Sequence, residues 1–276
     1  MKNKTNRTLL AALVVGSLIS PAVMAACNDT VLETCPAPFD AKLPDAHTML
    51  TWSQADRVVG FRNDYRNYAG DVFRHGNASP LLAAEKPLTD ARYQVNGQTY
   101  NLDDYLKRQN VSGMLVLKDG KVAYKYLGEG NTDSTLWTSR SVGKSVVSAL
   151  VGVAIKEGKI HSLDDLVTQY EPDLKGTAWD GVTLKQLITH TSGVAWNEDY
   201  TNPTSDFAKL TECEARPGTY ECVRTLVKGL HRAHPAGESW SYSSGGAWLL
   251  GDVLERATGM TLAAYLEKIG RASCRE

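Results

Sequence analysis

The chain has almost no net charge. Its 276 residues carry 30 Lys and Arg against 31 Asp and Glu, and no basic stripe or run of like charge occurs. This balance argues against nucleic acid or an anionic membrane surface as a partner. Internal repeats and low-complexity tracts are also absent.

Several common catalytic motifs are missing. There is no Gly-x-Ser-x-Gly elbow of an α/β-hydrolase, no phosphate loop and no His-Glu-x-x-His site. The sequence therefore implies no metal and no organic cofactor.

Cysteine is scarce. Apart from Cys274, the cysteines form two sequence-local pairs, Cys27 with Cys35 and Cys213 with Cys222. Zinc is a poor alternative, because the spacings are wide and no histidine lies at ligand spacing. In an oxidising compartment, two short disulfide loops are the simplest interpretation.

The first 26 residues have the pattern of a signal peptide. A basic start precedes an apolar run over residues 9–19, and small residues follow at 21–26. The run is too short to span a bilayer, so we expect export to the periplasm or beyond, without a membrane span after cleavage. An alternative is a lipoprotein box over residues 24–27, in which Cys27 would carry a lipid anchor.

The C-terminus has an unusual composition. Residues 268–276 back-translate to a common sequencing adapter read in frame, so we expect a foreign tail and native sequence that stops near Glu267. A truncated chain would then lack its late strands. A genuine basic tail is the alternative.

The order of the predicted elements indicates an α+β fold. Residues 27–94 form an N-terminal extension of unknown role, and a hairpin over 111–128 turns at Asp119-Gly120. The remaining predictions are a helix from Ser141 that stops at Gly158, a short element from Ser162, a helix over 184–193, a long loop over 195–219, and a helix over 248–257.

Ser141-x-x-Lys144 is the most informative pattern. A serine three residues before a lysine at a helix start places both side chains on one face. A neutral amine beside a hydroxyl is a base beside a nucleophile, which favours a serine hydrolase. The alternative is an ordinary surface helix that Ser141 caps.

Further segments follow this motif in a fixed order. They are Gly158–Asp165, Leu187–Gly193, Pro235–Ser244 and Leu249–Gly259. Together with Ser141-x-x-Lys144, this set resembles the serine hydrolases of the class C β-lactamase and penicillin-binding-protein superfamily, over residues 95–267. The resemblance implies a β-lactamase/transpeptidase-like fold, with an antiparallel sheet flanked by helices and a mostly helical subdomain.

The resemblance also implies catalytic roles. Ser141 would attack a carbonyl and form an acyl-enzyme, and Lys144 would take its proton. Tyr242, from a Tyr-x-Asn-like motif, would share protons with Lys144 and protonate the leaving group. The Ser141 backbone N–H would form half of an oxyanion hole. His190 is a candidate for a Ser-His catalytic triad, but the resemblance to this superfamily implies that its role is structural.

The segment over residues 193–200 is similar to the branch of 6-aminohexanoate-dimer hydrolases and related esterases. In that branch a tyrosine on a mobile loop contacts the substrate amide, and Tyr200 matches it; the alternative is an ordinary loop aromatic. Ser244 stands where the superfamily has an asparagine that binds the substrate's acyl-side amide, and this departure argues against β-lactam recognition. The third motif, a Lys/His-x-Gly segment on a late strand, does not occur in the chain.

The sequence thus predicts an exported hydrolase that cleaves a small-molecule amide or ester. β-Lactamase and D-alanyl-D-alanine carboxypeptidase activities are the alternatives among enzymes. The alternative of another class is a non-catalytic penicillin or cell-wall binding module of the same fold.

Overall fold

The computed structural model describes residues 43–66, 80–215 and 219–273. These residues all belong to one unit of the chain, Ala37–Glu276. The predicted signal peptide, Cys27 and Cys35 lie outside the described residues, so the signal peptide, the Cys27–Cys35 disulfide and the lipid anchor at Cys27 stay predictions.

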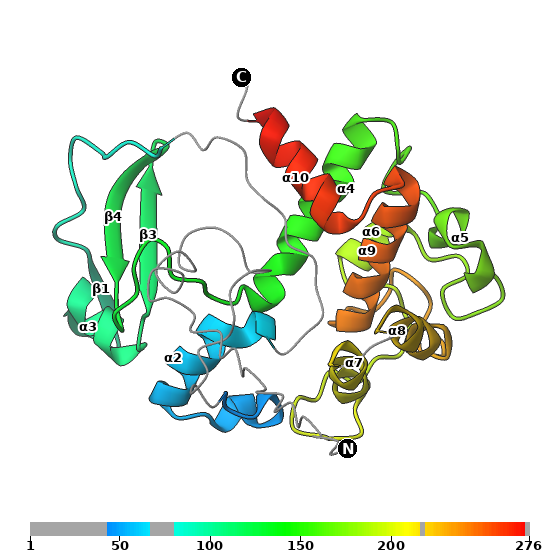
Figure 1. Cartoon of the computed structure of the whole chain (residues 1–276), viewed down its shortest axis with the longest axis horizontal. Coiled ribbons are helices and arrows are strands. Elements are labelled where there is room, and N and C mark those ends of the chain that lie inside the picture. The colour runs from blue at the N-terminus through cyan, green and yellow to red at the C-terminus, as the bar shows by residue number, and fades with distance from the viewer. Residues whose placement is uncertain (1–42, 67–79, 216–218, 274–276) are drawn as a thin grey trace, which may run out of the picture. The chain divides into compact units, whose positions relative to one another are not determined.

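Short helices and two hairpins make up the N-terminal half of the described chain (Figure 1). In order, the elements are η2 (Ala46–Thr51), α2 (Gln54–Asn63), η3 (Asp64–Arg66), β1 (Arg92–Val95), β2 (Gln98–Asn101), α3 (Leu102–Arg108), β3 (Gly113–Lys118) and β4 (Lys121–Leu127). β1 pairs with β2 and β3 pairs with β4, and both pairs are antiparallel. The predicted boundary at residue 94 falls inside β1, so the β1–β2 hairpin joins the extension to the hydrolase segment.

The β3–β4 hairpin agrees with its prediction. Asp119 and Gly120 form the turn with φ of 52° and 73°. Two positive φ angles are what a tight type I′ turn requires, and an Asp-Gly pair adopts them readily.

The C-terminal half is helical. It contains η4 (Arg140–Val142), α4 (Gly143–Lys156), α5 (Val167–Tyr170), η5 (Pro172–Leu174), α6 (Leu184–Ile188), α7 (Asp206–Glu214), α8 (Thr219–Lys228), α9 (Ser244–Thr258) and α10 (Leu262–Ser273). Helices with separate small antiparallel sheets confirm the predicted α+β class.

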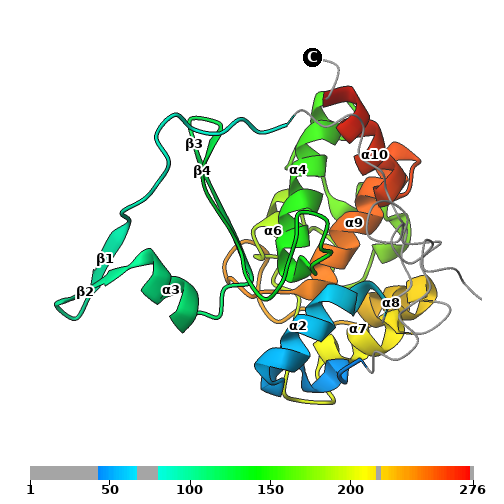
Figure 2. The same cartoon turned by 60° about the vertical axis from the view of Figure 1, so that its left-hand side comes forward.

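The core is built around α9. This helix contacts α4, α5, α6, α7, α8 and α10. Figures 1 and 2 both show α4, α9 and α10 side by side. Leu249, Val253 and Leu254 of α9 are almost fully buried. Trp179 is fully buried too, and its indole N–H donates to the Val227 carbonyl at 2.9 Å.

Two predicted boundaries are confirmed by glycines. Gly158 follows α4 with φ of 69°, and Gly259 caps α9 in the left-handed conformation. Glycine reaches this region without steric cost, so both helices end there.

α10 runs through Ser273, so residues 268–273 lie in a helix. Their assignment to a foreign tail stays a prediction.

Three other predictions are wrong. The helix predicted over residues 184–193 is shorter, because α6 ends at Ile188. The tract over residues 195–219 is not all loop, because it contains α7. Ser205 caps that helix by accepting a hydrogen bond from the Ala208 N–H, and Leu210 and Cys213 bury its apolar face. The short element predicted from Ser162 is a turn, and α5 begins only at Val167.

The predicted disulfide between Cys213 and Cys222 is confirmed. It joins α7 to α8, with the two Cα atoms 5.5 Å apart.

Among the described residues, no helix combines the length and the apolar character that a membrane crossing requires.

A buried ion network joins α8 to α9 and to the segment around α5. Arg224 of α8 donates to Glu171 at 2.7 Å and contacts Asp252 of α9. Arg256 reaches the other Glu171 oxygen at 2.6 Å. Burial raises the pKa of Glu171 to about 7, although Arg224 opposes the rise. Removing either a positive or a negative member of such a network leaves a buried charge without its partner, which lowers the stability of the fold.

Candidate active site

The nucleophile candidate lies in the turn before α4. Ser141 is in η4, and α4 begins two residues later at Gly143. The Lys144 Nζ lies 2.9 Å from the Ser141 Oγ. The i, i+3 spacing on one helical face produces this contact, as the sequence predicted.

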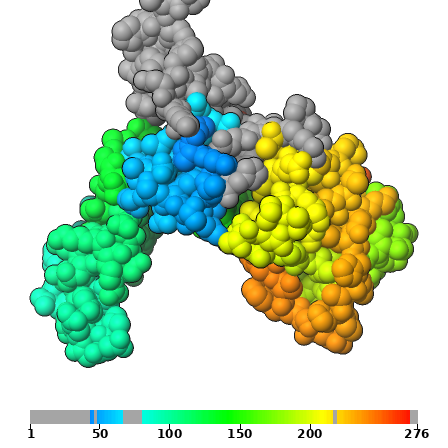
Figure 3. Space-filling model, turned by 90° about the horizontal axis from the view of Figure 1, so that it is seen from below, coloured from blue at the N-terminus to red at the C-terminus, as the bar shows by residue number. Residues whose placement is uncertain are grey.

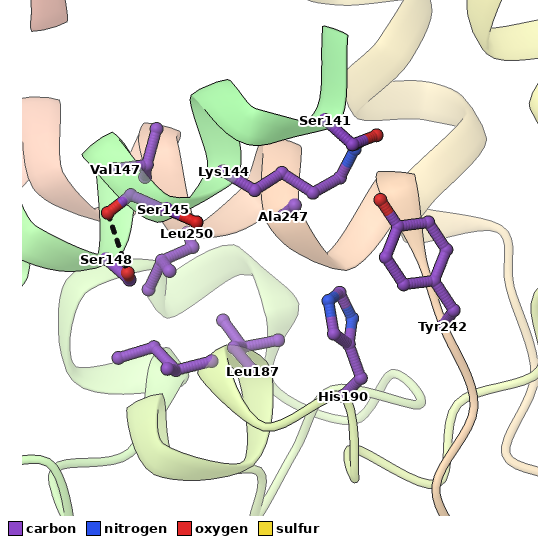
Figure 4. A pocket seen from close by; sticks show the side chains of 11 residues that line it. Ser141, Lys144, Ser145, Val147, Ser148, Leu187, His190, Tyr242, Ala247 and Leu250 are labelled. Atoms are coloured by element: carbon purple, nitrogen blue, oxygen red, sulfur yellow. Dashed lines mark hydrogen bonds between the residues drawn. The ribbon is translucent and has the colours of Figure 1, made fainter. Parts of the chain in front are cut away.

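Tyr242 reaches the same place from a distant segment. It lies just before α9, and its ring centroid is 5.2 Å from the Lys144 Nζ. Its hydroxyl points toward Ser141 and Lys144 (Figure 4). The fold therefore brings all three predicted catalytic residues together.

These residues line a pocket of about 210 Å³. The lining consists of Ser141, Lys144, Ser145, Val147, Ser148, Leu187, Ile188, His190, Tyr242, Ala247 and Leu250. The hydroxyls, the amine and the imidazole form a polar part, and aliphatic side chains form the rest. A carbonyl could therefore meet Ser141 while an apolar chain contacts the aliphatic part.

His190 packs against the tyrosine. Its ring centroid lies 4.6 Å from that of Tyr242, and its Nδ1 accepts the backbone N–H of Ser243 at 3.2 Å. This bond assigns the proton of the neutral ring to Nε2. Burial lowers the pKa of His190, and the charge of Lys144 lowers it further. His190 thus fixes the segment that carries Tyr242.

Glu198 is a residue that the sequence analysis missed. Its carboxylate accepts the Ser244 N–H at 2.9 Å and the Ser244 hydroxyl at 2.6 Å. It also accepts the Tyr200 hydroxyl at 3.0 Å and the Trp196 indole N–H. Figure 3 shows the yellow surface around α7 beside an orange surface from later in the chain. A lone carboxylate in a polar loop gives no periodic signal, so the sequence alone could not single it out.

Neither predicted substrate-binding residue lines the pocket. Ser244 is buried, and Tyr200 lies on the loop with its ring centroid 4.5 Å from that of Phe207. Burial raises the pKa of Tyr200 to about 12, and the charge of Glu198 adds to the rise. Their contact with a substrate stays a prediction.

An acidic residue of α7, Glu214, interacts electrostatically with Lys144. Burial raises the pKa of Glu214, and the positive charges of Lys144 and Arg140 oppose this rise.

No group of three or more histidine, cysteine, aspartate or glutamate side chains in the described part of the chain is arranged to hold a metal ion.

The α+β fold and a serine beside a lysine in a pocket define a class, the β-lactamase-like serine hydrolases. The profile of the Beta-lactamase family matches residues 100–270. The chain belongs to this family of serine hydrolases.

Individual relatives agree with this result. A 6-aminohexanoate-dimer hydrolase of Paenarthrobacter ureafaciens is 29% identical over 178 residues, which cover 60% of this chain and 44% of that protein. A Beta-lactamase of Escherichia coli K12 is 32% identical over 132 residues, covering 44% of this chain and 35% of the relative. The chain thus spans less than half the length of these curated relatives.

A solved structure shows the same fold. A protein of Bacillus anthracis provisionally named as a 6-aminohexanoate-dimer hydrolase superposes with a TM-score of 0.70 at 18% identity. The superposition covers 85% of this chain and 62% of that one. The predicted β-lactamase/transpeptidase-like fold is therefore confirmed.

Proposed function

We propose that the protein hydrolyses a small amide or ester through an acyl-enzyme on Ser141. The observation that carries the proposal is the 2.9 Å contact between the Lys144 Nζ and the Ser141 Oγ, inside a pocket that Tyr242 also lines. A nucleophile and a base within hydrogen-bond reach are what covalent catalysis by serine requires.

The proton transfers follow from this geometry. In its deprotonated form, the Lys144 amine takes the Ser141 proton as the oxygen attacks the carbonyl carbon. Lys144 and Tyr242 then return a proton to the leaving nitrogen or oxygen, and the acyl-enzyme forms. A water molecule attacks the acyl-enzyme in the same way, which releases the acid and restores Ser141.

The nucleophile turn also supplies an electrostatic group. The N–H of Ser141 precedes the regular hydrogen bonds of α4, so it has no acceptor four residues earlier within that helix. It can donate to the oxyanion of the tetrahedral intermediate.

The pocket lining supports a linear aliphatic substrate. Val147, Leu187 and Leu250 provide an apolar surface beside the nucleophile. A 6-aminohexanoate-type amide or a short-chain ester has the methylene chain that such a surface would contact. Ser244 stands where asparagine would bind the acyl-side amide of a β-lactam, and its hydroxyl donates to Glu198. We therefore favour the amide or ester over a β-lactam or a D-alanyl-D-alanine peptide.

We also propose that the protein is exported. The signal-like residues 1–26 motivate the proposal. The Cys213–Cys222 disulfide supports it, since such bonds persist in oxidising compartments.

A substrate panel tests the proposed function. The purified protein and its Ser141→Ala variant would be incubated with the linear 6-aminohexanoate dimer, 4-nitrophenyl butyrate and nitrocefin. We expect Ser141-dependent turnover of the dimer or the ester, with nitrocefin hydrolysed more slowly. Faster nitrocefin turnover would favour a β-lactamase. Stable penicillin binding without turnover of any substrate would favour a non-catalytic module.

A further inference from the structure

The residue before the nucleophile has an uncommon backbone conformation. Arg140 has φ of 44°, in the left-handed region that side chains other than glycine rarely adopt. Ser141 follows it directly, so the orientation of the Ser141 Oγ depends on what holds Arg140. Such strain persists only where the surroundings enforce it.

Asp64 supplies that enforcement from the N-terminal extension. Its side chain is buried, and it follows α2 in η3. Its Oδ1 accepts from the Arg140 Nη2 at 3.0 Å, and its Oδ2 accepts from the Thr138 hydroxyl at 2.7 Å. One carboxylate thereby binds two residues of the segment that leads to Ser141.

Further contacts fix the same two segments together. The Thr138 N–H donates to the Phe61 carbonyl at 2.9 Å. The Phe61 ring centroid lies 5.6 Å from that of Trp52 and 5.8 Å from that of Trp137, and the Arg140 guanidinium lies 5.8 Å from it. Asp64 is therefore held by packing as well as by its own hydrogen bonds.

Close packing inside the extension makes this support rigid. At Gly60, an added Cβ would approach Trp52 to 2.3 Å, so only glycine lets the indole lie against α2. Ser53 caps the helix by accepting from the Asp56 N–H. The end of α2 is thus fixed where Asp64 begins η3.

We propose that Asp64 is a positioning residue for Ser141. Its carboxylate holds Arg140 in the left-handed conformation and so aims the Ser141 Oγ at Lys144. This role rests on the proposed function of Ser141 as the nucleophile. It also gives a function to the extension, which lies outside the matched family residues 100–270.

The test begins with Asp64→Asn. Asparagine keeps the size of the side chain and an oxygen for Thr138, but it loses the charge that binds Arg140. We expect the rate of Ser141 labelling by a fluorophosphonate to fall about 10- to 100-fold, because small misplacements of reacting groups lower rates by factors of this size. With an ester substrate, kcat should fall and KM should stay near its original value.

A control removes an exposed aspartate–arginine ion pair elsewhere in the extension. Asp90 binds Arg92 at 2.7 Å, and both side chains are about two-thirds exposed. Asp90→Asn should leave the labelling rate unchanged. A misplaced reacting group should lower the labelling rate by much more than a factor of about two. If the labelling rate of Asp64→Asn lies within about twofold of that of the original protein, the positioning role is wrong.

A second variant separates positioning from general support. Glycine adopts a positive φ without strain, so Arg140→Gly removes the need to enforce that conformation. In this background, Asp64→Asn should reduce the labelling rate much less than it does alone. Equal losses in both backgrounds would mean that Asp64 stabilises the fold without aiming Ser141.

Hydrogen exchange provides a readout that does not need activity. Asp64→Asn should speed amide exchange over residues 138–143 and leave α9 unchanged. Unchanged exchange over 138–143 would overturn the inference. Absence of Ser141 labelling in the original protein would instead count against the proposed function, and the exchange result would still decide whether Asp64 holds the turn.

Discussion

Glu198 binds Ser244 through both the backbone and the side chain. The Ser244 N–H lies 2.9 Å from one carboxylate oxygen and the Ser244 hydroxyl 2.6 Å from the other. The carboxylate thereby joins the loop that carries Tyr200 to the start of α9. The two predicted substrate-binding residues share one acceptor.

We expect Glu198→Gln to destabilise this junction. Glutamine keeps one oxygen for the two N–H donors, and its NH2 group can donate to the two hydroxyls, but all four hydrogen bonds lose the charge of the carboxylate. Hydrogen bonds to charged groups are worth about 1.5–3 kcal/mol each, so we expect a loss of about 2–4 kcal/mol. Urea unfolding would measure it. Glu221→Gln, at an exposed position of α8, is the control. Equal stability of both variants would contradict the bonding described here.

Lys144→Arg should be as damaging to catalysis as Lys144→Ala. Arginine keeps the positive charge but does not give up a proton at working pH, so it cannot serve as the base. Steady-state ester hydrolysis would compare the two variants. If arginine preserved activity, Lys144 would act through its charge alone.

His190→Asn should flatten the pH dependence of stability. Burial lowers the pKa of His190, so the unfolded state binds this proton more readily. The contribution of neutral His190 is present above the unfolded pKa of about 6.5 and is lost as the pH falls through the folded value. Protonation would also remove the bond from the Ser243 N–H to Nδ1.

The asparagine variant isolates this titration. Its Oδ1 can accept the same N–H, and asparagine tolerates the φ of 56° at this position. Urea unfolding between pH 7.5 and 5 should show a steeper loss for the original protein than for the variant. Parallel curves would mean that His190 does not couple folding to pH.

Arg224→Leu should destabilise the helical half by about 3–5 kcal/mol, because buried Glu171 and Asp252 would lose their shared partner. The deficit should shrink from pH 7 to pH 5, since Glu171, whose pKa burial raises to about 7, can then take up a proton. Lys228→Leu removes only a half-exposed contact to Asp173 at 3.4 Å. That control should cost less than about 1 kcal/mol. Equal losses would argue against a buried network.

The sequence predicted the local features well. The Ser141–Lys144 contact follows from helical spacing, and the hairpin at Asp119-Gly120 follows from turn chemistry. Gly158 and Gly259 end their helices for the same local reason. Tyr242 came from the family resemblance.

Tertiary contacts account for what the sequence did not predict. α7 is short and lies in a polar tract, so packing and the Ser205 cap decide its helical state. The Ser244 partner of Glu198 is 46 residues away in sequence. Asp64 is 76 residues from Arg140. No local pattern marks a carboxylate whose partners only the fold brings near.

Intact-mass analysis after incubation with a fluorophosphonate tests the central claim most directly. We predict one covalent adduct on the folded protein, mapped to the peptide that contains Ser141. Ser141→Ala should remove the adduct and lower ester turnover by a factor on the order of a million, as loss of a serine nucleophile does elsewhere. An adduct on another residue that persists in Ser141→Ala, or no adduct on the folded protein, would contradict an acyl-enzyme at Ser141.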